Sequence, residues 1–207
     1  MREDYKGIYW IFKRVFDISI SIFILFLLIP LWVFIMLAVK LEEPTASPIF
    51  KQTRVGKQGH TFKMFKFRTM VSDAEFLRVG LEEENEHSGP IFKIKKDPRV
   101  TRVGVFLRKT SLDEFPQLMN VIKGDMSLIG PRPALCEEVS RYSEEQKKRL
   151  AITPGCTGLW QVSGRSNLCF EEMVELDLKY IENYGLLMDI KIFFRTFKVI
   201  FTGEGAY

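Results

Sequence analysis

"ISISIFILFLLIPLWVFIMLAV", from Ile18 to Val39, is the only long apolar segment of the sequence. It carries no charged residue and is longer than the roughly 20 residues that a helix needs to cross the hydrocarbon core of a bilayer. Pro30 lies near its middle. The proline ring removes one backbone N–H and crowds the carbonyl of Phe26, so a kink is predicted at this point.

Basic residues flank this segment on both sides. Those before it are Lys6, Lys13 and Arg14, and those after it are Lys40, Lys51, Arg54 and Lys57. Because basic flanks favour the cytoplasmic side, both ends are expected there. A re-entrant helix, which breaks at Pro30 and enters and leaves through one leaflet, satisfies both observations. Asp17 is then expected where the helix enters the membrane.

A single spanning helix, with a periplasmic domain, remains an alternative. A signal peptide is disfavoured, since no small-residue cleavage site follows.

Length and composition allow one domain with its own core. The chain has 207 residues, 46% of them hydrophobic, and a formal net charge of +4. That balance excludes a disordered chain and suits ligands that carry phosphate or anionic lipid. The three cysteines form no CxxC motif, which argues against a disulfide framework and for a reducing compartment. The two histidines have no zinc-ligand spacing.

The remaining chain predicts a helix-rich α/β fold of the α+β kind, associated with the membrane. We place a membrane segment at 1–43 and a cytoplasmic domain at 44–207. Residues 48–56 and 60–70 are predicted to form two strands joined by a turn, with Phe65 and Phe67 on the opposite face from Lys66 and Arg68. Amphipathic helices are predicted at 143–151, 170–184 and 186–201. The last has a wide apolar face, so it suits a core helix with a share of contact with lipid.

"TSLDEFPQLMNVIKGDMSLIGPRP", from Thr110 to Pro133, holds the adjacent carboxylates Asp113 and Glu114. Ser111 with Glu114 fits a capping box, but Pro116 would then lose a helical hydrogen bond. We therefore expect the helix to start at Asp113 or Glu114 and to stop at Gly124. Carboxylates at a helix N-terminus stay ionised, as a nucleophile or a metal ligand must.

Two adjacent carboxylates also attract Mg²⁺, which commonly bridges to phosphate. The cations that could clamp a phosphate are Lys66, Arg68, Arg108 and Arg132. The alternative interpretation of these charges is an ordinary solvated surface.

Four segments resemble the bacterial sugar transferase family, the monotopic phosphoglycosyl transferases that act on polyprenyl phosphate. They are "FKFRTM", "LRKTSLDEFPQLMNVIKGDMSLIGPRP", "TPGCTGLWQVSGRSN" and "LDLKYIENYGLLMDIKIFFRT". The resemblance runs from about Lys13 to the C-terminus. It implies a re-entrant membrane helix and a cytoplasmic catalytic part with interfacial helices. One departure is Ile29, where the family often carries serine before the proline.

The resemblance implies that a sugar 1-phosphate passes from a UDP-sugar to undecaprenyl phosphate through a covalent aspartyl intermediate, with release of UMP. Asp113 matches the nucleophile and Glu114 the Mg²⁺-associated acid, and both are candidate metal ligands. The candidate substrate and phosphate ligands are Lys66, Arg68, Arg108, Arg132, Gln117, Asn120 and Arg165. The ending of the chain resembles members that transfer a hexose such as galactose or glucose.

The expected location is the cytoplasmic face of the bacterial inner membrane, in exopolysaccharide or other glycoconjugate assembly. A homodimer is left open, and nucleic acid is not expected as a partner because no binding motif appears. The rival interpretation is a non-catalytic scaffold that holds anionic lipid through its basic patches.

Overall fold

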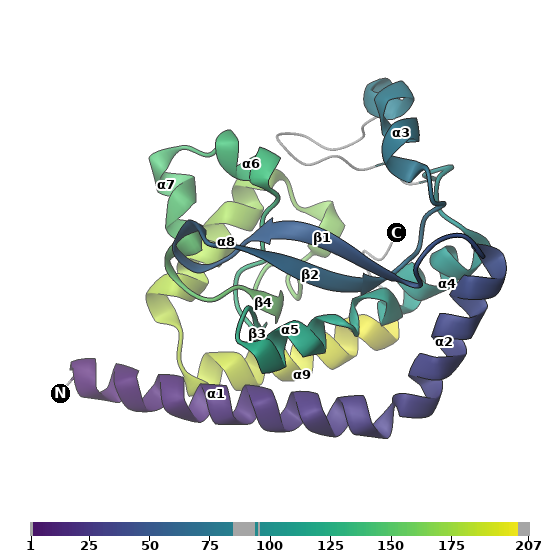
Figure 1. The fold of residues 1–207 in the computed structure, drawn as a ribbon. Coiled ribbons are helices and arrows are strands. Elements are labelled where there is room, and N and C mark those ends of the chain that lie inside the picture. The colour runs from purple at the N-terminus through teal and green to yellow at the C-terminus, as the bar shows by residue number, and fades with distance from the viewer. Residues whose placement is uncertain (1, 85–93, 95, 203–207) are drawn as a thin grey trace.

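The computed structural model of the protein describes residues 2–84, 94 and 96–202 (Figure 1). The chain starts with two long helices, α1 (Arg2–Leu27) and α2 (Ile29–Glu42), which meet at Leu28. Pro30 lies in the first turn of α2, where its missing N–H is tolerated. Between Gly7–Leu27 and Ile29–Glu42 the axis bends by 66°. The predicted kink is therefore confirmed as a break just before the proline.

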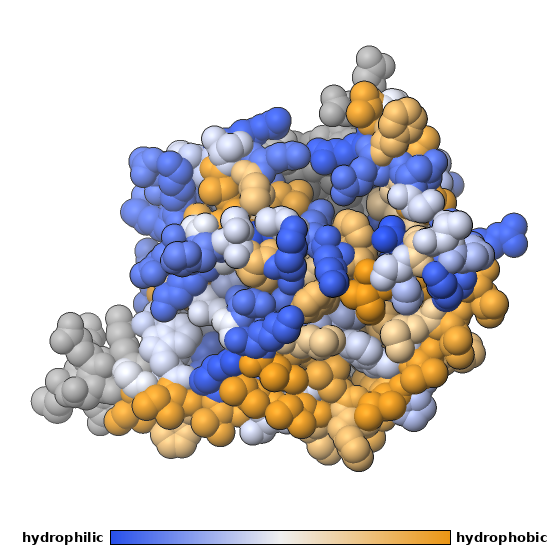
Figure 2. All heavy atoms as spheres, viewed as in Figure 1, coloured by the Kyte–Doolittle hydropathy of each residue, from blue (hydrophilic) through white to orange (hydrophobic). Residues whose placement is uncertain are grey.

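No single described helix has the length and apolarity to span a membrane, but the bent pair meets that test as a unit. Large apolar side chains of both helices are exposed around the break, among them Phe23, Phe26, Phe34 and Leu37. Figure 2 shows an apolar band that runs along α1 and up α2, while hydrophilic side chains gather over the elements above it.

An antiparallel hairpin follows the bent pair. Strand β1 (Ile49–Val55) pairs with β2 (Thr61–Phe67) in a register that sets Lys51 opposite Phe65. The turn contains the short 3₁₀ helix η1 (Lys57–Gly59), in which Gln58 has a φ of 55°. The predicted pair of strands and its turn are confirmed.

The remaining elements wrap around this hairpin (Figure 1). In chain order they are α3 (Ala74–Arg78), η2 (Val79–Glu84), α4 (Arg102–Thr110), η3 (Leu112–Glu114), α5 (Gln117–Lys123), β3 (Ser127–Ile129), α6 (Cys136–Ser140), α7 (Glu144–Lys147), η4 (Lys148–Ala151), β4 (Gly155–Thr157), η5 (Arg165–Asn167), α8 (Phe170–Asn183) and α9 (Leu186–Thr202). Strands β3 and β4 form a second, parallel pair. The helix-rich mixed α/β class is confirmed. All three cysteines are free, which agrees with the argument against a disulfide framework.

Of the three buried clusters among the described residues, two contain residues of β2. The larger surrounds Val121 of α5 and joins Met64 of β2, Leu128 of β3, Tyr180 of α8 and Ile192 of α9. The smaller sets Ile35 and Val39 of α2 against Phe67 of β2 and Leu107 of α4. Burial of each such side chain contributes about 1.5–3 kcal/mol. Helix α2 is thus part of the core that carries the hairpin.

Helix α1 is fixed to the rest of the protein by buried polar contacts. Asp17, which is 3% exposed, accepts hydrogen bonds from Ser127 Oγ at 2.6 Å and from the Leu128 N–H at 3.3 Å. Arg14 donates to the carbonyls of Val121 and Ile122 in the last turn of α5. Strand β3 thus supplies the partners that let this carboxylate be buried. The expectation that Asp17 lies where the helix enters the membrane stays a prediction.

Helix α9 is joined to α1 by a second buried polar group. Asp189 forms an ion pair with Lys13 at 2.6 Å and accepts from the hydroxyls of Tyr9 and Tyr180, each at 2.7 Å. Leu187 and Phe194 of the same helix are exposed. Helix α9 thus has a buried side and an apolar exposed side, as its sequence predicts. The division into 1–43 and 44–207 stays a prediction.

Candidate active site

The two adjacent carboxylates lie in a tight turn between two helices. Helix α4 ends at Thr110, and Ser111 takes the left-handed conformation with φ 57°. The 3₁₀ helix η3 then carries Asp113 and Glu114, and α5 begins only after Pro116. The prediction that a helix starts at Asp113 or Glu114 is wrong in its boundary, because the proline lies at the N-cap of α5. The stop at Gly124, with φ 98°, is confirmed.

Lys66 on strand β2 faces both carboxylates. Its Nζ lies 2.6 Å from Glu114 Oε1 and 4.0 Å from Asp113 Oδ2. The side chain of Glu114 is 44% exposed, whereas that of Asp113 is only 12% exposed. One acid is thus open to solvent and held by an ammonium group, while the other is enclosed beside it.

Burial and charge shift the two acids in opposite directions. Burial raises the pKa of Asp113 to about 6, against the lowering effect of Lys66 and Arg108. For Glu114, burial also acts to raise the pKa, but the charge and hydrogen bond of Lys66, with Arg132 and Arg165, lower it overall. For the pKa of Asp113, the rise caused by loss of hydration thus outweighs the lowering that was expected from a helix N-terminus. At neutral pH most of this carboxylate is still ionised and poorly hydrated.

Three arginines complete a positive rim around the acids. Arg108, at the end of α4, donates to Thr69 Oγ1 at 3.1 Å, and its charge acts on Asp113. Arg165 donates to Ser111 Oγ at 3.3 Å, and its charge acts on both acids. Arg132 acts on Glu114, and its guanidinium lies 6.0 Å from the centre of the Trp160 ring. With Lys66 these residues form four cations around two carboxylates, an excess of positive charge that suits a diphosphate.

The other predicted ligands are placed differently. Arg68 donates to the Ser47 carbonyl at 2.8 Å and lies over the ring of Phe50. Asn120 is fully buried and joins α5 to β2, since it accepts from the Phe65 N–H and donates to the Lys63 carbonyl. Gln117 is 3% exposed. These contacts indicate that Asn120 has a structural role, since it holds α5 against β2. The predicted substrate role of these three side chains stays a prediction.

Two further residues support this rim, and the sequence motifs do not predict them as site residues: Arg54 and Thr69. Arg54, 5% exposed, donates to the Pro133 carbonyl at 3.1 Å and so supports the turn that carries Arg132. Thr69 accepts the hydrogen bond of Arg108. Arg54 ends a run of four polar residues, Lys51 to Arg54, which predicts an exposed cation. Only the fold brings it beside residues 131–133.

The residues at this turn fit a magnesium ion held partly by a substrate. Among the described residues there is no group of three His, Cys, Asp or Glu side chains that could hold a metal alone. Mg²⁺, however, is usually bound by one or two carboxylates with phosphate oxygens and water, which is the donor set that Asp113, Glu114 and a diphosphate supply.

The sequence matches the model of the bacterial sugar transferase family over residues 8–203. The chain belongs to this family, so the resemblance noted from its motifs is confirmed.

Among similar proteins are the galactosyl transferase CpsE of Streptococcus agalactiae and the undecaprenyl-phosphate galactose phosphotransferase of Salmonella typhimurium. The first is 46% identical over 98% of this chain and 45% of its own length, and the second 45% identical over 94% and 41%. The exopolysaccharide production protein ExoY of Sinorhizobium fredii is 40% identical over 94% of this chain and 88% of its own length. The chain thus spans less than half the length of CpsE and of the Salmonella transferase, and most of ExoY.

Proposed function

We propose that the protein is a membrane-associated phosphoglycosyl transferase, which passes a hexose 1-phosphate from a UDP-sugar to polyprenyl phosphate on the cytoplasmic face of the bacterial inner membrane. The observation that carries this proposal is the enclosed carboxylate of Asp113, beside the exposed Glu114, inside a rim of four cations. The names of two relatives support the same substrates. The Salmonella transferase is named for undecaprenyl phosphate and galactose, and a further relative, 39% identical over 98% of this chain and 43% of its own length, is the UDP-glucose:undecaprenyl-phosphate glucose-1-phosphate transferase of Escherichia coli.

In the first step, Asp113 Oδ attacks the phosphorus that carries the sugar. The bond from this phosphorus to the bridging oxygen breaks, and UMP leaves with the electron pair. In the second step, an oxygen of polyprenyl phosphate attacks the same phosphorus. The bond to Asp113 breaks and the free carboxylate returns. Two displacements at one atom predict ping-pong kinetics.

The chain's own residues account for much of this chemistry. Poor hydration of Asp113 leaves a carboxylate that gives up little solvation when it attacks. Arg108, Arg132 and Arg165 stabilise charge on the diphosphate and on the leaving UMP. Lys66 holds the carboxylate of Glu114 in place. Asp113 and Glu114 would hold Mg²⁺, which would supply further neutralisation of phosphate charge.

A shallow membrane helix pair explains why such a site belongs at the bilayer surface. Extraction of a lipid tail costs about 0.8 kcal/mol per CH₂, so the acceptor phosphate has to react at the level of the headgroups. The re-entrant form of α1 and α2 is supported by their bend and by the exposed apolar side chains around it.

A panel of UDP-sugars with undecaprenyl phosphate tests this proposal, with released UMP as the readout. We expect one or a few hexoses to give turnover, and Asp113→Asn to lower it by roughly 10³-fold or more, as loss of a nucleophile does. Asp73→Asn is the matched control, because Asp73 is exposed and makes no capping hydrogen bond. Undiminished turnover in Asp113→Asn would refute the assignment.

A further inference from the structure

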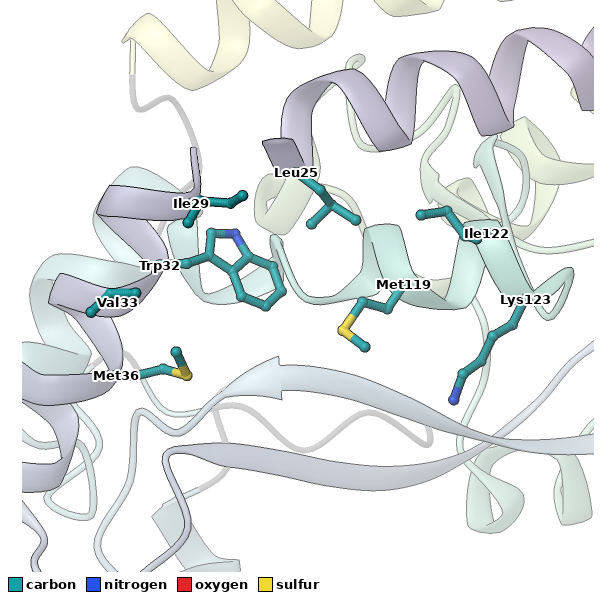
Figure 3. Close-up of a pocket in the computed structure, with 8 residues that line it drawn as sticks. All are labelled: Leu25, Ile29, Trp32, Val33, Met36, Met119, Ile122 and Lys123. Atoms are coloured by element: carbon teal, nitrogen blue, oxygen red, sulfur yellow. The ribbon is translucent and has the colours of Figure 1, made fainter. Parts of the chain in front are cut away.

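An apolar groove opens on the inner side of the bend between α1 and α2, where both helices face α5 (Figure 3). Its volume is about 470 Å³, within the usual range of ligand pockets of roughly 300–1,000 Å³. The wall is formed mainly by Leu25, Trp32, Met36, Met119, Ile122 and the stem of Lys123. Met119 is 40% exposed. A groove of this kind in the most apolar region of the surface suits a hydrocarbon chain.

One end of the groove is positively charged. The ammonium group of Lys123 lies 4.5 Å from the centre of the Phe65 ring, and that of Lys51 lies 5.9 Å from the same centre. Both lysines are exposed, and no carboxylate pairs with either of them within the described part of the chain. An apolar wall that ends at two free ammonium groups is complementary to a lipid with an anionic headgroup.

This charged end is separate from the reacting carboxylates. Lys51 and Phe65 face each other on one side of the hairpin, while alternation along β2 sends Lys66 to the other side, toward Glu114. Lys123 is the last residue of α5, which begins after the carboxylates, and seven residues of helix extend about 10 Å. A headgroup held at Lys123 therefore cannot be the phosphate that reacts with Asp113.

We propose that this groove binds one anionic phospholipid of the bilayer, with an acyl chain along Trp32 and Met119 and the phosphate at Lys51 and Lys123. The proposal rests on the membrane association in the proposed function, but not on the reaction. The indole N–H of Trp32 is buried without a hydrogen-bond partner, and its nitrogen edge faces Ile29 and Leu25 (Figure 3). An acyl chain would therefore contact the hydrocarbon part of the indole ring, because the buried N–H points into the apolar wall.

Bound lipid in this position would brace the bend. Its chain would fill the space between α2 and α5, two elements that otherwise leave Met36 and Met119 facing a gap (Figure 3). Because α2 also packs on Phe67 of β2, next to Lys66, occupancy of the groove would stabilise the strand that positions this lysine. The lipid would thus act as a structural partner of the transferase.

Native mass spectrometry of the full chain in detergent, titrated with phosphatidylglycerol and separately with phosphatidylcholine, tests the proposal without sugar nucleotide. We expect one phosphatidylglycerol to bind in preference to phosphatidylcholine. Lys51→Gln and Lys123→Gln should each weaken its binding roughly fivefold. Met119→Trp should abolish binding by filling the groove. Lys57→Gln, at an exposed lysine of the hairpin turn, is the matched control.

Equal affinity of the lysine variants and the unmodified chain would overturn the proposal. So would displacement of phosphatidylglycerol by undecaprenyl phosphate from the unmodified chain, because the groove would then hold the acceptor's tail. If Met119→Trp does not fold, the double lysine variant decides by itself. Asp113→Asn should bind phosphatidylglycerol unchanged, so a failure of the proposed reaction and a failure of this site give different results.

Discussion

Asp113 shows how one carboxyl group obtains properties that its neighbour lacks. Both acids stand in the same short turn, yet Asp113 is enclosed and Glu114 is open and paired with Lys66. Burial raises the pKa of Asp113 to about 6, and Lys66 keeps it from rising further. The difference between the two residues comes from the fold around them and not from their positions in the sequence.

The pH dependence of turnover should report this carboxyl group. In the proposed mechanism the ionised form of Asp113 attacks the substrate, so activity should be present above its pKa and be lost as the pH falls through about 6. Lys66→Met removes a positive charge that lowers this pKa, so the acid limb should move to higher pH by about one unit or more. The measurement is a pH–rate profile of UMP release. A limb that stays in place in Lys66→Met would show that another group controls it.

Among the elements, the close contact of α4 with the segment after β2 fixes the direction of Arg108. A Cβ atom at Gly104 would lie 2.1 Å from the Thr69 carbonyl oxygen. The first turn of α4 is capped by Thr101 and by Glu42 of α2, which accepts from the Arg102 and Val103 N–H groups. Helix α2 thus holds the start of the helix whose last turn carries Arg108.

Gly104→Ala should destabilise the protein by about 1–3 kcal/mol, because either the backbone of residue 69 or the whole of α4 has to move. Turnover of the folded fraction should fall as well, since Arg108 moves with the helix. Gly80→Ala is the control, because its Cβ atom would meet nothing within 4 Å. Thermal unfolding in detergent measures both variants, and equal midpoints would contradict the packing described for α4.

Asp17→Ala should also be destabilising, because it leaves the Leu128 N–H of β3 without its buried side-chain acceptor and Ser127 Oγ with the Ile129 carbonyl in place of a carboxylate. The expected loss is about 1–3 kcal/mol. Asp73→Ala, at an exposed aspartate without a capping hydrogen bond, should change little. Chemical denaturation in detergent compares the two. A variant at position 17 as stable as the unmodified chain would show that α1 is not anchored through this carboxylate.

Local patterns predicted elements well where neighbouring residues decide the structure. The hairpin, the helices after residue 143, the stop at Gly124 and the break near Pro30 all follow from alternation, periodicity and backbone chemistry. The start of α5 was misplaced, because a 3₁₀ turn after a left-handed Ser111 has no distinctive sequence signal. The acids and most of the cations could be predicted, but the burial of Asp113 and the support from Arg54 depend on contacts between distant segments.

For the whole molecule, the bent helix pair is part of the structure that holds the site. Helix α1 contacts β3, α5 and α9, while α2 packs on β2 and caps α4. The sequence suggests a membrane segment followed by a catalytic part, and patterns along the chain carry no sign of these links. If α1 and α2 lie in the bilayer as proposed, a change in their depth is therefore expected to move the residues that surround Asp113.

Labelling of single cysteines tests the re-entrant arrangement. Cys136, Cys156 and Cys169 are first replaced by serine, and a cysteine is then placed at Gly7 or at Lys57, both of which are exposed. In intact spheroplasts, an impermeant maleimide should label neither position. In inverted membrane vesicles it should label both. Labelling of one position in each preparation would show a spanning helix and would contradict the proposed topology.

Intact-protein mass spectrometry, after incubation with Mg²⁺ and a UDP-sugar but without lipid acceptor, tests whether Asp113 becomes covalently bound to sugar phosphate. We expect a mass increase equal to one sugar phosphate. The increase should be absent in Asp113→Asn and should disappear when undecaprenyl phosphate is added. An unmodified mass, together with UMP release only in the presence of the lipid, would contradict a covalent intermediate on Asp113.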